Sequence, residues 1–104
     1  MRGLPYKLQK AGAFTFMSRN DIIEKLHKQF KDEAEGIEYY IKLSEEAEQL
    51  NEYTLAQKLL NMARDEYVHG NYIKEQLERA GITATEEEKQ AWNKSVEHLF
   101  GYVK

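Results

Sequence analysis

The chain has 104 residues and no cysteine, which indicates one small domain without disulfide bonds. The lack of cysteine also excludes thiolate zinc sites, cysteine-ligated iron–sulfur clusters and a cysteine nucleophile. Hydrophobic residues make up 41% of the chain and charged residues 32%, a balance typical of a globular protein. One proline and six glycines give too few turn signals for a many-stranded sheet, so the composition favours long helices.

The net charge of −3 is unevenly distributed along the chain. Residues 1–18 contain three basic residues and no acidic one, so the rest of the chain is strongly acidic. An acidic body argues against a nucleic-acid-binding protein, because such proteins present a basic face. The longest uncharged run, residues 11–18, is far shorter than the roughly 20 residues that span a bilayer. We therefore expect no nucleic-acid or membrane partner, a cytoplasmic location, and a flexible or docking tail over residues 1–18.

The first long helix is expected over residues 19–50. Ser18 and Asp21 provide a hydroxyl N-cap and an acidic group near the positive end of the helix dipole. Apolar or small residues then recur in steps of three and four, which is the pattern of a helix that packs along its whole length. The expected core positions are Ile23, Leu26, Phe30, Ile37, Tyr40, Ser44 and Ala47.

A second helix is expected over residues 52–80. Asn51 offers a cap at its start, with Glu52 in the first turn, and Gly81 is a C-terminal stop signal of the left-handed type. The expected core positions of this helix are Leu55, Leu59, Met62, Ile73 and Ala80, widened by Ala56, Leu60, Ala63 and Leu77.

A shorter third helix is expected over residues 86–103. Thr85 and Glu88 form a capping box at its start, and one side carries Trp92, Val96, Leu99 and Val103. Two long helices joined by so short a turn must lie antiparallel. One hairpin cannot bury both apolar stripes, even with a third helix against it. We therefore expect an all-α domain over residues 19–104, in which two copies of the chain complete a four-helix bundle.

Three ionisable residues occupy positions where the helical pattern predicts core: Glu33 in the first helix, and Glu66 and His69 in the second. A buried, unpaired carboxylate costs several kcal/mol, so such positions call for an explanation. Glu33 and His69 are each 18 residues from Asn51, which places both roughly 27 Å from the turn. Glu66 lies within one helical turn of that height, and its i,i+3 spacing from His69 points both side chains the same way.

One Glu from one helix and a Glu-x-x-His pair from its neighbour are half of a dinuclear carboxylate site. We therefore predict that Glu33, Glu66 and His69 bind metal, and that Tyr40 can hydrogen-bond a ligand carboxylate as an outer-shell group. Tyr40 is equally well explained as a core tyrosine. His27 and His98 are predicted to be surface residues without a matching carboxylate. Gly36 and Gly70 fall near predicted ligands, where a close helix approach or a bound group would explain them.

Two segments, residues 32–40 and residues 63–69, resemble the ferritin-like superfamily, nearest its rubrerythrin-like branch. In that branch a Glu is followed seven residues later by a Tyr, as Glu33 is by Tyr40, and a Glu-x-x-His follows on the next helix. The similarity covers about residues 20–80 and a single hairpin, as in the half-length encapsulated ferritins. It implies a homodimer or higher homo-oligomer with a carboxylate-bridged centre of iron, or of iron and manganese. Such centres often oxidise Fe²⁺ with oxygen or peroxide.

Two other functions fit the same pattern of residues. One is a metal-free helical dimerisation module in which the acidic residues among the core positions set the register between helices, as buried polar groups can. The other is a redox-silent metal carrier or sensor that uses the same three ligands. Enzymatic activity of the ferroxidase type is therefore one of three hypotheses.

Overall fold

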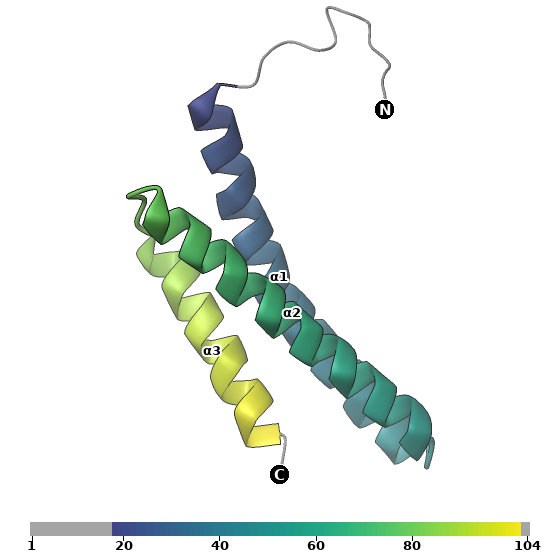
Figure 1. Ribbon diagram of the computed structural model, residues 1–104. Coiled ribbons are helices and arrows are strands. Elements are labelled where there is room, and N and C mark those ends of the chain that lie inside the picture. Colours follow the sequence, from purple (N-terminus) through teal and green to yellow (C-terminus); the bar gives the residue numbers. More distant parts are fainter. Residues whose placement is uncertain (1–17, 103–104) are drawn as a thin grey trace, which may run out of the picture.

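A computed structural model describes residues 18–102, which form three α-helices and no β-strand. The helices are α1 (Arg19–Gln49), α2 (Tyr53–Arg79) and α3 (Glu86–Tyr102). Figure 1 shows α1 and α2 side by side as an antiparallel hairpin, with the shorter α3 lying along it. The prediction of an all-helical fold with three helices is confirmed. The predicted tail, apart from Ser18, lies outside the described residues, as does Val103.

The start of α1 is fixed by the capping box that the sequence predicted. The Asp21 amide donates to Oγ of Ser18 at 3.0 Å, and the Ser18 amide donates to a carboxylate oxygen of Asp21 at 3.2 Å. Two N–H groups that a helix start leaves without partners are thus satisfied locally.

Both long helices end at a residue with a left-handed backbone. Asn51 has a φ of 62° and Gly81 a φ of 75°, and in each case the next amide donates back to the final turn of the helix. The stop predicted at Gly81 is confirmed. At the first turn the structure differs from the prediction, because Asn51 ends α1 instead of capping α2. Asparagine tolerates this conformation, and Glu52 precedes α2 without a side-chain capping bond.

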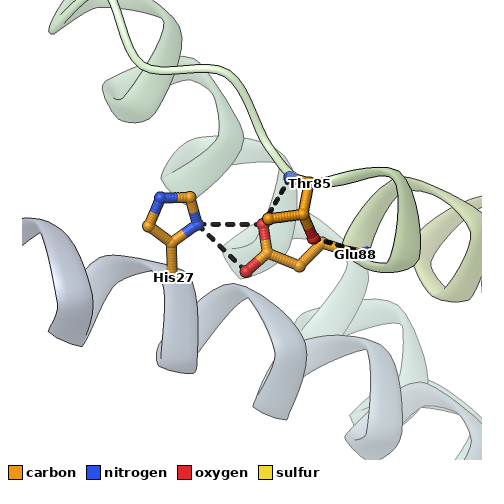
Figure 2. A network of polar contacts seen from close by, with 3 residues as sticks. All are labelled: His27, Thr85 and Glu88. Atoms are coloured by element: carbon orange, nitrogen blue, oxygen red, sulfur yellow. Dashed lines mark hydrogen bonds and ion pairs between the residues drawn. The ribbon is translucent and has the colours of Figure 1, made fainter.

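The capping box of α3 is confirmed and is also linked to α1. The Glu88 amide donates to Oγ1 of Thr85, and a carboxylate oxygen of Glu88 accepts from the Thr85 amide. Figure 2 shows that the same carboxylate also contacts the imidazole of His27, whose Nδ1 lies 2.9 Å from Oε1 of Glu88. The opposite end of α3 has a similar pair, with Nδ1 of His98 2.9 Å from Oε1 of Glu38. The prediction that His27 and His98 lack carboxylate partners is therefore wrong, because both partners lie on distant segments.

The core lies between all three helices. It contains Phe30, Ala34, Ile37 and Ile41 from α1, Ala63 and Leu77 from α2, and Trp92 and Leu99 from α3. The buried hydroxyl of Ser44 donates to the Ala56 carbonyl, and that of Ser95 donates to the Ala34 carbonyl, so both buried serines are satisfied. None of the helices in the described part of the chain combines the length and apolar character that a membrane-spanning segment needs.

The core face of α2 was predicted only in part, since Ala56, Ala63 and Leu77 are buried as expected while other predicted core positions are exposed. Four small or apolar residues spaced by seven are buried, namely Ala56, Ala63, Gly70 and Leu77. Leu55 and Met62, predicted as core, are 49% and 43% exposed, and Ala80 is also exposed. The reason is steric, since alanine and glycine allow α2 to approach its neighbours closely. Leu55 and Met62 are thereby left largely exposed, whereas Ile73 still packs against the core.

Candidate metal centre

The three residues predicted as metal ligands come together on one side of the hairpin. Glu33 lies on α1, and Glu66 and His69 lie one turn apart on α2. Each offers one ligand atom, and these atoms all lie within 4.8 Å of one another. The antiparallel pairing of two helices of matched length produces this juxtaposition, as the equal distances from the turn predicted.

Glu33 is the buried member of the cluster, with only 5% of its surface exposed. Its Oε2 accepts a hydrogen bond from the side-chain amide of Gln29, one turn earlier on α1. Its Oε1 is buried and has no hydrogen-bond partner among residues 18–102. Buried polar atoms are nearly always satisfied, so this oxygen is a position that a cation or a hydrogen-bond donor could occupy. Gln29 therefore holds one oxygen of Glu33 and leaves the other without a partner among the described residues.

The imidazole of His69 lies within ion-pair distance of both carboxylates. Nδ1 of His69 lies 3.6 Å from Oε1 of Glu66 and 3.9 Å from Oε1 of Glu33. Both separations are too long for a hydrogen bond. Two ligands that bind one ion at about 2.1 Å are about 3–4 Å apart, so these two distances are also compatible with a shared ion. The oxygen-rich donor set with one imidazole is of the kind that hard or borderline divalent cations prefer.

Ionisation of both Glu33 and Glu66 is electrostatically unfavourable in this cluster. Burial raises the pKa of Glu66 above its ordinary value, and the nearby Glu33 carboxylate raises this pKa further. His69 acts in the opposite direction but does not cancel the shift. Two carboxylates that face each other in a partly buried site repel, and a bound cation would remove that repulsion.

Tyr40 and two residues outside the predicted set complete the description of the site. Tyr40 is half-buried against the core and its ring meets Tyr39 edge-on, with no hydrogen bond to the cluster within residues 18–102. Its role as an outer-shell group stays a prediction. Sequence reasoning missed the part played by Gln29, although its i,i+4 spacing from Glu33 was a readable signal. A close helix approach or a bound group was expected at Gly36, and the structure places the Glu66 side chain directly against this glycine.

Comparison of the chain with family models, with curated proteins and with solved structures finds no match. The geometry of these side chains is therefore the only feature that points to a metal centre within residues 18–102.

Proposed function

We propose that this chain is a half-length ferritin-like protein that binds iron between two copies and oxidises Fe²⁺ there. The ligands in each copy are Glu33, Glu66 and His69. The observation that carries the proposal is the buried, unpartnered Oε1 of Glu33, which faces the two other ligands. Burying such an oxygen is costly unless a cation or a donor reaches it.

The surface around the cluster supports a second copy as the partner that closes the site. Leu55, Leu59, Met62 and Ile73 lie on the same face of α2 as Glu66 and His69, at positions separated by three or four residues. Leu55 and Met62 are about half exposed, so this stripe of apolar residues is only partly covered by the chain's own helices. A two-fold axis near the cluster would bury the stripe and bring together four Glu and two His. That is the ligand set of dinuclear carboxylate bundles.

The donor set fits the proposed chemistry. Carboxylates bind hard cations and can bridge two of them, and an imidazole nitrogen completes the coordination of each ion. Bound iron would supply the one-electron chemistry, with oxygen or peroxide as the oxidant. The chain's own contribution is to hold Glu33 through Gln29 and to bring Glu66 and His69, one turn apart on α2, next to Glu33.

Oxygen consumption after addition of Fe²⁺ to the metal-free protein tests the proposal. We expect the wild type to consume oxygen faster than the buffer alone, and Glu33→Gln and His69→Ala to fall to the buffer rate. Glu35→Gln is the matched control, because Glu35 is an exposed acid two residues from Glu33 and outside the cluster. Wild-type protein that binds Fe²⁺ without consuming oxygen would indicate the redox-silent carrier. Protein that binds no metal would indicate the dimerisation module.

A further inference from the structure

Gly36 lies in the middle of α1, one turn after Glu33, where a glycine destabilises a helix relative to alanine. Its backbone has no positive φ, so no turn or unusual conformation requires glycine at this position. The reason for this residue must therefore lie in what packs against it.

The side chain of Glu66 occupies the space that a Cβ at position 36 would fill. A Cβ built on Gly36 would lie 2.2 Å from Oε2 of Glu66, 3.0 Å from Cδ and 3.2 Å from Cγ. The outer half of the Glu66 side chain is thus laid across the backbone of α1. No real Cβ tolerates the shortest of these contacts, so an alanine here would force the carboxylate to move.

The two oxygens of Glu66 therefore have different surroundings. Oε2 lies against Gly36, while Oε1 is directed at His69, with 3.6 Å between Oε1 and Nδ1. With Oε2 held against the α1 backbone, Oε1 faces the space shared by the three ligands. Moving Oε2 outward would rotate Oε1 out of this arrangement.

We propose that Gly36 is a positioning residue, whose missing side chain allows Glu66 to lie across α1 and direct one carboxylate oxygen at the metal. This inference rests on the proposed function, since it assigns a role toward the same centre. Gly36 itself touches no metal and donates no ligand. It acts only through the orientation of the Glu66 carboxylate.

Gly36→Ala should affect metal binding much more than folding. The atoms that a new Cβ would meet belong to the far end of a flexible side chain, which can swing toward solvent because Glu66 is a quarter exposed. The contrast is Gly70, where a Cβ would meet the ring of the buried Trp92 at 2.2 Å. An indole ring enclosed in a core cannot swing away, so that glycine serves packing.

The first test needs no metal and is a double-mutant cycle in chelator. Melting temperatures are measured for wild type, Gly36→Ala, Glu66→Ala and the double variant. In the Glu66→Ala background the obstructing carboxylate is absent, so Gly36→Ala should raise the melting temperature by about 4–8 °C, the full gain of alanine over glycine. In the wild-type background the gain should be clearly smaller, because the carboxylate must be displaced. Equal gains in the two backgrounds would overturn the contact between Gly36 and Glu66.

The second test is anaerobic Fe²⁺ titration of Gly36→Ala against wild type. We expect binding to weaken about 10- to 100-fold, the usual effect of disturbing the groups that orient a metal ligand. Gly101→Ala is the matched control, because Gly101 is also helical and a Cβ there would meet nothing within 4 Å. Wild-type affinity in Gly36→Ala would overturn the positioning role. A wild type that binds no Fe²⁺ would instead overturn the proposed function. The double-mutant cycle in chelator would still test the contact between Gly36 and Glu66.

Discussion

Nδ1 of His69 on α2 lies 3.9 Å from Oε1 of Glu33 on α1, and this oxygen is buried without a partner among residues 18–102. Their separation is too long for a hydrogen bond and is compatible with an ion pair or with two ligands of one ion. Burying this oxygen costs free energy unless a cation or a hydrogen-bond donor reaches it.

The stability of the metal-free protein should depend on pH through Glu66. Its pKa is raised in the folded state by burial and by Glu33, so the folded chain holds this proton to higher pH than the unfolded chain. Glu66 therefore contributes most to the free energy of unfolding below about pH 4.3, the ordinary pKa of a glutamate. Its contribution declines as the pH rises through the raised pKa of Glu66 in the folded state. Glu66→Gln cannot lose a proton and should escape the decline.

Urea unfolding in chelator, at about pH 4 and again near neutrality, measures this dependence for both proteins. We expect Glu66→Gln to gain stability relative to wild type between the acidic and the neutral measurement. If the difference in the free energy of unfolding between the two proteins stays constant with pH, the pKa of Glu66 is not raised in the folded state.

The stripe of apolar residues on α2 that contains Leu55, Leu59, Met62 and Ile73 should mediate self-association. Met62→Glu places a charge in the middle of the stripe, where a second copy would bury it, and should convert a dimer into a monomer. Val68→Glu is the matched control, because Val68 is 61% exposed on another face of the same helix. Sedimentation velocity at micromolar concentration distinguishes the outcomes. A folded wild-type monomer, or equal effects of the two variants, would argue against this interface.

Gly70 should be required for packing between α2 and α3. Gly70→Ala places a Cβ 2.2 Å from the ring of Trp92, which also packs on Phe30 and stacks on Tyr67. Overpacking of this kind destabilises by about 1–3 kcal/mol, and the better helix propensity of alanine offsets about 1 kcal/mol of it at most. Chemical unfolding should therefore show Gly70→Ala to be less stable than Gly101→Ala. Equal stability would mean that Trp92 can move aside.

The contact between His27 and Glu88 should stabilise the docking of α3 on α1. The side chains are 23% and 13% exposed, so their hydrogen bond is partly shielded from water. A double-mutant cycle with His27→Ala and Glu88→Gln should give a coupling energy of about 1 kcal/mol. The more exposed pair of His98 and Glu38 should give less. Urea unfolding of the variants in both cycles gives the two coupling energies. A coupling energy near zero for His27 and Glu88 would contradict a stabilising role for this contact.

The helices and their ends were largely predictable, because the signals that fix them are local. Ser18 with Asp21, Gly81, and Thr85 with Glu88 act within one turn of the chain, and each forms the structure that its sequence indicates. The grouping of Glu33, Glu66 and His69 also followed from the sequence. Helix rise and a short turn are enough to place three residues at one height on two antiparallel helices.

What was missed depends on how the helices are rotated and packed. The α2 sequence carries two adjacent stripes, one of large apolar residues and one of alanine and glycine, and periodicity alone does not say which faces α1. Contacts such as that of His27 with Glu88 join residues 61 positions apart. The contact of Gly36 with Glu66 exists only once the helices are placed, since a glycine gives no sign of the side chain that will occupy its space.

We propose that two copies of the chain close a metal site around Glu33, Glu66 and His69. Anaerobic Fe²⁺ titration of chelator-stripped protein, with Glu33→Gln and Glu35→Gln measured alongside, tests it most directly. We predict saturation near one Fe²⁺ per chain, or two per dimer, for wild type and Glu35→Gln, and no stoichiometric binding by Glu33→Gln. A ratio near zero for wild type, or full binding by Glu33→Gln, would contradict the claim.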